Sequence, residues 1–525
     1  MRAVSLESSK YFAAGPSVRR TLTPRSRAAP SALTRALDGE PWPSSTIHRS
    51  AKTRVLLAGL FAALATVVFP LPTAAASRST DAWLEDSHSR WEQLARRIWE
   101  TPELALEEKR SAAALVEVLQ KEGFHVTWGS GGQPTAFVAT AGSGAPVVAW
   151  LAEYDALPGL SQAAGKTTRT PLVADGPGHG CGHNLLGVAA VAAAVAANHE
   201  RLERKLPGTL QVFGTPAEEL GLGKTFMVRD GAFKSTDIVL AWHPDTENRV
   251  CNRSRLALSI MDVEFFGRSA HAASSPWLGR SALDALMLFD HAMALMREHI
   301  KPTARIHRKL SDGGRAANII PDYAKGQYWL RDADGEGVAE MLARLRKAAE
   351  GAALATETRA QVTLLNSNRN PLPNDTLSKL VQQELERVGA PRFDAADVEF
   401  AKRLQQEMGV ETSGLATTVM PYSPTNGATA SSDIGEVSAV APLAELGVAV
   451  RPFGTAAHHW VQTSCAAHPV GYKGMLVAAK VLAATGVDLL SEPATIAAIR
   501  AEFALRTKGK PYVSPLTPDQ KPQAY

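Results

Sequence analysis

The chain has little cysteine and little excess of charge, and each shortage excludes a class of protein. Three cysteines in 525 residues are too few for a disulfide-stapled scaffold, and at least one has no partner within the chain. The formal net charge is only +4. Residues 1–54 hold ten Lys/Arg and three Asp/Glu, a net of +7, which leaves the remaining chain at −3. A basic nucleic-acid-binding face on the folded body is therefore not expected.

The overall composition is that of an ordinary globular protein. Hydrophobic residues make up 45% and charged residues 21%, which excludes a fully disordered or collagen-like chain. Domains average roughly 150 residues, so a chain of this length exceeds one small module. The sequence contains no internal repeat.

The first 76 residues have the pattern of a targeting segment. Lys52 and Arg54 precede an apolar run at 55–69, and small residues follow up to Ala76. This order is typical of a signal peptide cleaved after Ala76, and it predicts a periplasmic or secreted protein. The alternative is an uncleaved membrane anchor, although the run is short for a hydrocarbon core of about 30 Å. No later run is expected to be apolar for long enough to span a bilayer.

Helical and strand-like patterns alternate along the mature chain. Residues 81–123 have a helical pattern that is interrupted at Pro102. Strand-like runs and one long Ala/Val-rich helix follow, at 147–154, 184–202, 210–215 and 238–243. The alternation predicts an α/β catalytic domain with a mostly parallel sheet, made from residues 77–254 and 368–506.

Residues 255–367 differ in pattern from the segments on either side. Their expected order, βαββαβ, is that of a ferredoxin-like α+β unit. We therefore predict an inserted lid and dimerisation domain, whose exposed sheet edge can pair with another chain. The remaining residues, 507–525, are Pro-rich and polar, and we expect this tail to be loosely held.

The Gly-rich segment GHGCGHN is the strongest local signal of chemistry. It places Cys181 and His183 two residues apart at the start of a helix, so both side chains can point at one ion. A thiolate and an imidazole suit a borderline metal such as Zn²⁺. The structural alternative is a small buried cysteine beside a capping histidine.

Carboxylates and histidines follow in three further segments. Glu218 and Glu219 come directly after the strand-like run LQVFGT, and His243 ends another such run. The pair His458–His459 lies far along the chain. Each signal alone is weak, because Glu pairs are usually solvated and single histidines are usually structural.

Taken together, these side chains form a ligand set with one carboxylate to spare. The set offers more ligands than one tetrahedral ion uses. Its members are Cys181, His183, Glu219, His243 and one of His458 or His459. The set therefore predicts two ions that share a bridging ligand. Two metals can activate a water and polarise a carbonyl together. The neighbouring Glu218 can then move protons.

Eight motifs now identify a family resemblance. In order along the chain they are EYDALPGLSQ, GHGCGHNLLG, GTPAEE, AWHP, GRSAHAA, GGRAANIIPDYA, SSDIGEVS and AHHW. Their order resembles the metal-dependent amidohydrolase/peptidase superfamily of aminoacylase and carboxypeptidase G type, over residues 83–490. The spelling EYDALPGLSQ and the long linker to GHGCGHN favour the branch that contains the B subunit of p-aminobenzoyl-glutamate hydrolase.

The resemblance implies a role for each matching residue. It implies five metal ligands, with the thiolate as a bridge: Cys181, His183, Glu219, His243 and His458. Glu218 matches the general base. In the inserted domain, His271 and Asn318 match residues that contact substrate, commonly across a dimer interface, and Arg331 matches an arginine that recognises a substrate carboxylate. The doublet leaves open whether His458 or His459 is the ligand.

Four other residues have an expected location but no assigned role in the chemistry. Asp155 and Asp433 are expected near the site, where carboxylates often orient ligating histidines. Cys251 and Cys465 are expected to be buried and inert, with a disulfide between them as the alternative.

The resemblance implies hydrolysis of an amide bond in N-acyl or N-aroyl amino acids, with two divalent ions, Zn or Mn, in each copy of the chain. A homodimer is the default partner state, and a hetero-oligomer with a related subunit is the alternative. Two other functions stay open, a dipeptidase for basic or unusual dipeptides and a non-catalytic binding or partner subunit. The complete ligand set with Glu218 favours an enzyme.

Overall fold

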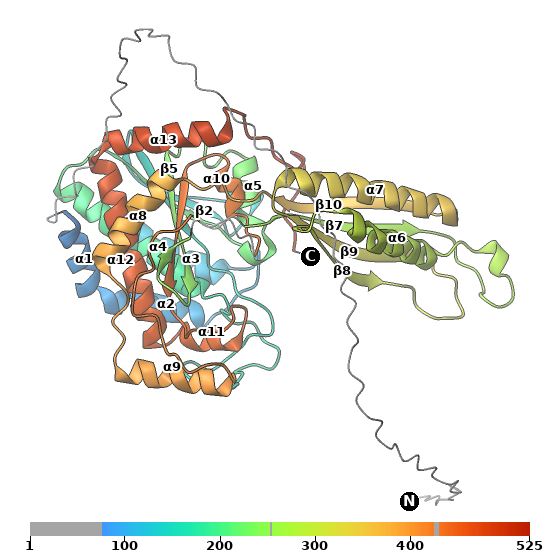
Figure 1. Cartoon of the computed structure of the whole chain (residues 1–525), viewed down its shortest axis with the longest axis horizontal. Helices are drawn as coiled ribbons and strands as arrows, with labels where there is room; N and C mark the ends of the chain where they lie inside the picture. Colours follow the sequence, from blue (N-terminus) through green and yellow to red (C-terminus); the bar gives the residue numbers. More distant parts are fainter. Residues whose placement is uncertain (1–75, 252–254, 425–429, 525) are drawn as a thin grey trace, which may run out of the picture. The chain divides into compact units, whose positions relative to one another are not determined.

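The structure is a computed structural model that describes residues 76–251, 255–424 and 430–524. The expected targeting segment lies outside the described residues, apart from Ala76, which begins the first helix. Within the described chain, the elements form a catalytic domain around a seven-stranded sheet and a lid domain around a four-stranded sheet (Figure 1). The predicted fold class is confirmed.

The catalytic sheet has the strand order β1-β2-β4-β3-β5-β11-β6. Its strands are β1 (His125–Trp128), β2 (Phe137–Ser143), β3 (Val147–Ala152), β4 (Gly208–Gly214), β5 (Ile238–Asp245), β6 (Arg249–Val250) and β11 (Leu443–Ala449). The four central strands β4, β3, β5 and β11 are parallel, whereas β1, β2 and β6 pair antiparallel at the edges. The sheet is therefore parallel where the site is built and mixed at its edges.

Helices cover both faces of this sheet. They are α1 (Ala76–Asp86), α2 (His88–Trp99), α3 (Lys109–Lys121), α4 (His183–Glu203), α5 (Gly223–Arg229), α8 (Asp375–Val388), α9 (Ala395–Glu407), α10 (Ile434–Ser438), α11 (Trp460–Cys465), α12 (Pro469–Ser491) and α13 (Pro493–Thr507). Successive residues of β3 point to opposite faces. Trp150 packs in the core with α4 and α12, while Leu151 packs in the second core with α5 and α10.

Small residues let the core helices approach the sheet closely. A Cβ on Gly187 of α4 would lie 2.6 Å from the carbonyl oxygen of Glu153, and one on Gly486 of α12 would lie 2.4 Å from the Trp150 ring. Contrary to the expectation, α12 is long and apolar enough to cross a membrane by composition. However, 78% of its apolar window is buried within the protein, where the helix packs against α4. Its composition therefore fits a core helix.

The lid has the predicted order βαββαβ. Its elements are β7 (Ala257–Phe266), α6 (Ala282–Met296), β8 (Arg305–Asp312), β9 (Tyr323–Asp332), α7 (Gly335–Thr356) and β10 (Arg359–Asn368). All pairings in the sheet order β10-β7-β9-β8 are antiparallel. Ser281 and Asp334 cap the two helices with their side chains. One edge of this sheet is β8, most of whose side chains are exposed.

The C-terminal tail, residues 508–524, is packed, and the expectation of a loosely held tail is wrong. Leu516 is only 5% exposed. The hydroxyl of Tyr512 donates a hydrogen bond to Glu436, and the side chain of Arg369 donates to the carbonyl of Val513. Composition misled because a Pro-rich segment without secondary structure can still bury single apolar side chains and offer its carbonyls as acceptors.

All three cysteines are free, so the alternative of a Cys251–Cys465 disulfide is not realised. Burial raises the pKa of both of these thiols to about 12, which keeps them protonated and inert.

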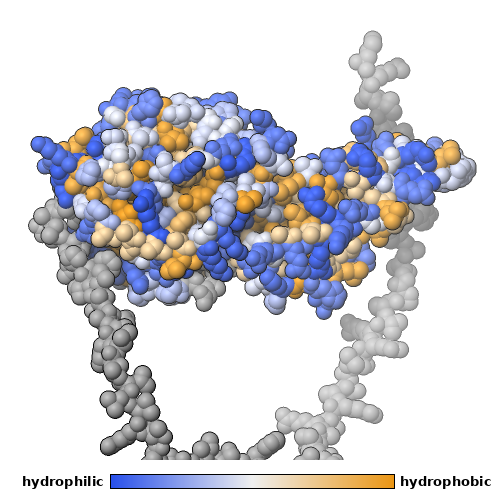
Figure 2. Space-filling view, turned by 90° about the horizontal axis from the view of Figure 1, so that it is seen from above, coloured by the Kyte–Doolittle hydropathy of each residue, from blue (hydrophilic) through white to orange (hydrophobic). Residues whose placement is uncertain are grey.

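On the face drawn in Figure 2, apolar residues are interspersed among hydrophilic ones.

Candidate metal centre and active site

The site lies at the carboxyl ends of adjacent parallel strands. Asp155 follows β3, Glu218 and Glu219 follow β4, and His243 lies near the end of β5. Because β4, β3 and β5 are neighbours, their ends bring these side chains to one edge of the sheet. His183 joins them from the first residue of α4.

Two groups of potential ligands share the thiol of Cys181. One group contains Cys181, His183 and His243, and the other contains Cys181, Glu219 and His458; within each group the ligand atoms lie within 4.8 Å of one another. Sγ of Cys181 is 3.3 Å from Nε2 of His243, and Nε2 of His458 is 3.2 Å from Oε2 of Glu219. The structure thus brings together five side chains that are up to 277 positions apart, from Cys181 to His458.

Hydrogen bonds on the far side of each ring orient the histidines. Nδ1 of His183 lies 2.8 Å from Oδ1 of Asp155, while Oδ2 of Asp155 accepts from the backbone N–H of Glu219 at 2.9 Å. Nδ1 of His243 lies 2.9 Å from the carbonyl oxygen of Pro244, to which it donates. Each ring therefore turns Nε2 toward Cys181, the arrangement found behind metal-ligating histidines.

The inner atoms of this cluster fit a cation. Oε1 of Glu219 and Nε2 of His183 are buried and make no hydrogen bond, although Oε2 of Glu153 lies 3.4 Å from Nε2 of His183. Buried polar atoms without a partner are rare in folded proteins. The donor set combines sulfur, imidazole nitrogen and carboxylate oxygen, which suits a borderline divalent ion such as Zn²⁺. The residues present therefore fit a metal centre.

The cluster also shifts the acidity of its own members. Burial alone would raise the pKa of the Cys181 thiol, but the imidazoles of His243 and His183 hold that pKa well below its ordinary value. Burial would lower the pKa of His243, yet the neighbouring thiolate raises it to about 9. The metal-free protein thus holds a thiolate beside an imidazolium, and ligation at His243 must release a proton.

Two non-glycine residues of the site have left-handed backbone conformations. Ala217, directly before Glu218, has φ 56°, and His458 also has φ 56°. Such conformations cost about 1–3 kcal/mol each and persist only where surrounding contacts fix them. The buried carboxylate of Glu108 accepts the backbone N–H of Ala217 at 2.9 Å, and the N–H of His458 donates to the carbonyl of Gly180 at 2.9 Å.

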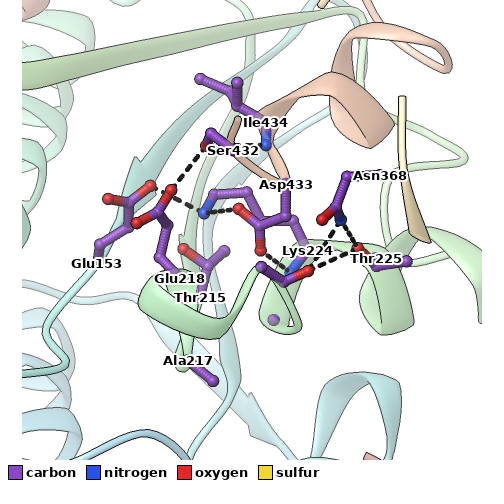
Figure 3. A network of polar contacts seen from close by, with 12 residues as sticks. Glu153, Thr215, Ala217, Glu218, Lys224, Thr225, Asn368, Ser432, Asp433 and Ile434 are labelled. Carbon is purple, nitrogen blue, oxygen red and sulfur yellow. Dashed lines mark hydrogen bonds and ion pairs between the residues drawn. The ribbon is translucent and has the colours of Figure 1, made fainter. Parts of the chain in front are cut away.

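Glu218 lies in a buried polar network (Figure 3), of whose other members the sequence placed only Asp433 near the site. The hydroxyl of Ser432 donates to Oε1 of Glu218 at 2.7 Å. Nζ of Lys224 pairs with Glu153 at 2.8 Å and with Asp433 at 2.7 Å. Burial and the charge of Cys181 would raise the pKa of Glu218, but Lys224, His183 and the hydrogen bond from Ser432 lower it, so this carboxylate is ionised and able to accept a proton.

The sequence carried signals for these additional residues. Glu153 and Asp155 belong to the same motif, EYDALP, and Ser432 stands beside Asp433 in SSDIG. Lys224 follows the glutamate pair closely, in a segment with no conspicuous pattern. Its role as the counter-ion of Glu153 and Asp433 is visible only in the folded chain.

A cavity of about 440 Å³ opens onto the cluster and is lined by both domains. From the lid, β9 contributes Trp329 and Arg331. Nη1 of Arg331 donates to the hydroxyl of Ser431 at 2.9 Å, and its buried Nε has no hydrogen-bond partner. Among the described residues no carboxylate pairs with Arg331, whereas Arg255 in the same cavity pairs with Glu445 at 2.7 Å.

The other predicted substrate contacts lie elsewhere. His271 and Asn318 are exposed in the lid and do not line the cavity. They are near each other, since the backbone N–H of Ala272 donates to the carbonyl of Asn318 at 3.0 Å. His459 belongs to neither ligand group and caps α11, accepting the N–H of Val461 at 3.3 Å.

The chain belongs to peptidase family M20/M25/M40, whose family model matches residues 149–483. It is therefore a metal-dependent amidohydrolase/peptidase, and the superfamily resemblance is confirmed. Among similar proteins, the B subunit of p-aminobenzoyl-glutamate hydrolase from Escherichia coli K12 is 37% identical over 85% of this chain and 98% of its own. Xaa-Arg dipeptidase of Mus musculus is 32% identical over 80% of this chain and 90% of its own.

Solved structures share the fold. The aminobenzoyl-glutamate utilization protein of Klebsiella pneumoniae superposes with a TM-score of 0.55 at 18% identity, covering 78% of this chain and 98% of its own. A dinuclear metal-binding peptidase of the M20 family from Bacillus subtilis gives a TM-score of 0.51 at 18% identity, covering 78% and 99%.

Proposed function

We propose that this enzyme hydrolyses the amide bond of N-acyl or N-aroyl amino acids whose amino-acid part is acidic, with p-aminobenzoyl-glutamate as the reference substrate. The observation that carries the proposal is the guanidinium of Arg331, which faces the cavity beside the cluster without a carboxylate partner among the described residues. A guanidinium fork binds a carboxylate through two parallel hydrogen bonds. The 37% identity to the hydrolase from Escherichia coli supports the same substrate class.

Two divalent ions, Zn²⁺ or Mn²⁺, would be held by the two ligand groups, with the thiolate of Cys181 shared. Bound ions of this kind polarise a carbonyl and make a water more acidic. His458 fits the ligand role better than His459, because only His458 lies beside Glu219. The same ions would also neutralise the buried oxygen of Glu219 that has no hydrogen bond.

Glu218 performs the proton transfers. Its ionised carboxylate takes a proton from the attacking water, whose oxygen adds to the scissile carbonyl. The protonated Glu218 then delivers that proton to the amide nitrogen, and the C–N bond breaks to release the amine. Ser432 fixes the carboxylate through its hydrogen bond at 2.7 Å, which limits rotation of the base during the reaction.

The charge of the cavity favours an acidic over a basic substrate. Among the described lining residues the only carboxylates are Glu218 and Glu219, which the chemistry occupies. The arginine side chain of an Xaa-Arg dipeptide would therefore find no free carboxylate there. This observation ranks the N-acyl amino acid above the dipeptide, although a relative with the second activity is 32% identical.

The test is a parallel assay of Zn²⁺-, Mn²⁺- and Co²⁺-loaded enzyme on p-aminobenzoyl-glutamate, N-acetyl-glutamate and a set of Xaa-Arg dipeptides. We expect the acidic substrates to be cleaved at least ten times more efficiently. In Arg331→Met, KM for them should rise about 10- to 100-fold, as expected for loss of a charged hydrogen bond. Arg305→Met on the exposed strand β8 is the matched control. Preferential cleavage of dipeptides would contradict the proposal.

We propose that the lid mediates dimerisation. The exposed apolar side chains Met287, Leu288 and Leu295 on α6 and Leu310 on the edge strand β8 support this surface. His271 and Asn318 would then act in the cavity of a second copy, where His271 would stabilise the developing oxyanion. The relative from Escherichia coli is named as one subunit of a hydrolase, so a related chain is the alternative partner. Light scattering of the purified protein, alone and with such a chain, tests both.

We propose that residues 1–76 direct export and are removed after Ala76. The basic flank at Lys52 and Arg54, the apolar run at 55–69 and the small residues before Ala76 support this. Amino-terminal sequencing of protein from the periplasm or medium should begin at Ser77. An intact amino terminus in the membrane fraction would instead support an anchor.

A further inference from the structure

The C-terminal tail lies beneath the loop that carries the two site glutamates. We call residues 217–223 the glutamate loop. Leu516 of the tail packs in one apolar cluster with Ala217 and Leu222 of this loop and with Phe226 of α5, all of them at most 5% exposed. Ala217 directly precedes Glu218 and has the left-handed φ of 56°. A side chain more than 290 positions away therefore shares one apolar cluster with the residue that directly precedes the base.

The same tail is bound to the lid. Nε2 of Gln520 donates to the carbonyls of Leu364 and Leu365 in β10, at 3.0 and 2.8 Å. Nη1 of Arg229, at the end of α5, donates to the carbonyl of Gln520 at 2.6 Å. Figure 1 shows the tail leaving α13 and running to the base of the lid, where the chain ends.

The lid end also contacts the glutamate loop directly. Nδ2 of Asn368, the last residue of β10, donates to the carbonyl of Gly221 at 2.9 Å and to the hydroxyl of Thr225 at 2.6 Å. Figure 3 shows Asn368 and Thr225 beside Lys224, whose ammonium pairs with Glu153 and Asp433. A Cβ on Gly221 would lie 2.6 Å from Oδ1 of Asn368, so this contact needs glycine. The glutamate loop, strand β10 and the tail thus lie together at one place in the fold.

We propose that the tail is a strap that fixes the glutamate loop to lid strand β10, with Leu516 as the positioning residue beneath Glu218 and Gln520 as the tie to the lid. The loop has little regular structure of its own, because residues 218–220 form only a single 3₁₀ turn, and contacts from the strap hold it in place. Without Leu516 the loop loses its apolar support, and the base samples orientations that do not reach the attacking water. The kinetic part of this inference rests on the proposed hydrolase activity.

The experiment uses the full-length protein, four single variants and one truncation. Leu516→Ala removes the apolar support, Leu516→Met restores its volume, and Gln520→Ala cuts the tie to the lid. Val513→Ala is the matched control, because the Val513 side chain is 68% exposed and only its carbonyl is used. The truncation, after Gly509, removes the tail but keeps the end of α13. Hydrogen–deuterium exchange of peptides covering 215–223 and steady-state kinetics are measured on each.

We expect Leu516→Ala and the truncation to lower kcat at least ten-fold with KM changed less than three-fold, and to speed exchange at 215–223 at least five-fold. Gln520→Ala should show the same changes to a smaller extent, while Leu516→Met and Val513→Ala keep wild-type values. Faster exchange spread over the whole catalytic domain would overturn the proposal, as would wild-type kcat and exchange in Leu516→Ala. If the truncated chain fails to fold, the single variants decide. The exchange measurement needs no substrate, so its outcome is independent of the proposed activity.

Discussion

The thiol of Cys181 lies 3.3 Å from Nε2 of His243 and is the one atom common to both ligand groups of the site. This sharing makes the two groups distinguishable by mutation. A variant at a ligand that belongs to one group only should remove the ion from that group, whereas a variant at the shared thiol should affect metal binding in both groups.

Metal stoichiometry tests the shared thiolate. Under the proposed stoichiometry of two ions per chain, Cys181→Ala should lower bound metal to fewer than about 0.3 ions, because both groups lose a charged ligand. His458→Ala and His243→Ala should each retain about one ion, in different groups. Metal content after dialysis, measured by mass spectrometry, gives the numbers. His459→Ala is the control, and two ions retained in Cys181→Ala would refute the bridge.

Replacement of the base should separate catalysis from metal binding. Glu218→Gln keeps the size and the hydrogen bond with Ser432 but cannot take a proton, so kcat should fall about 10²- to 10⁴-fold. Bound metal should stay at the wild-type amount, because neither group that contains Cys181 includes Glu218, which lies instead in a third group with Glu153 and His183. A variant with wild-type turnover would remove Glu218 from the mechanism.

Asp155 should contribute to metal affinity without touching the ion. Its two oxygens contact Nδ1 of His183 at 2.8 Å and the N–H of Glu219 at 2.9 Å, so Asp155→Asn disturbs a ligand of each group. Loss of such supporting partners typically lowers metal affinity about 10- to 100-fold. Competition with a fluorescent chelator measures this. Asp488→Asn, another buried aspartate outside the site, should leave the affinity unchanged.

Asp488 should make stability depend on pH. Burial, with help from Glu384 and Glu492, raises the pKa of this carboxyl from 3.8 to about 8. The folded chain therefore keeps a proton that the unfolded chain releases, and the free energy of unfolding falls as pH rises between about 4 and 8. Asp488→Asn abolishes that loss, so its Tm should exceed the wild-type value by about 3 °C or more at pH 8.5 and differ little at pH 4.

The control for this pH dependence is Asp86→Asn, an exposed position on α1. Thermal melts of metal-free protein at both pH values remove the contribution of metal binding, and the titration of the site histidines cancels in the difference between Asp488→Asn and wild type. An equal Tm difference between Asp488→Asn and wild type at both pH values would show that Asp488 titrates normally.

Most of the architecture could be predicted from the sequence, because local patterns carry it. The order βαββαβ at 255–367 is confirmed, because burial alternates along β9 and because Ser281 and Asp334 cap the two helices. Sequence also singled out Cys181, His183, Glu219, His243 and the doublet His458–His459, because thiol, imidazole and carboxylate side chains are recognisable as metal ligands. Their roles as ligands stay predictions.

Other features were not predictable because they depend on contacts between distant segments. The edge strand β1 is short and largely exposed, so it has no strong apolar pattern. The tail looked unstructured by composition, yet Leu516 is buried in one apolar cluster with Ala217, Leu222 and Phe226. The pairing of Lys224 with Glu153 and Asp433 joins segments 71 and 209 residues away.

The amino-acid sequence by itself determined the fold class, the division into catalytic and lid segments and the chemical types available for a metal site. It did so because periodicity and residue chemistry are local properties. Only the tertiary structure decided that His458 rather than His459 lies beside Glu219, that Arg331 faces the cavity, and that His271 lies outside it. Those outcomes depend on how backbone direction and packing orient each side chain, which no local pattern encodes.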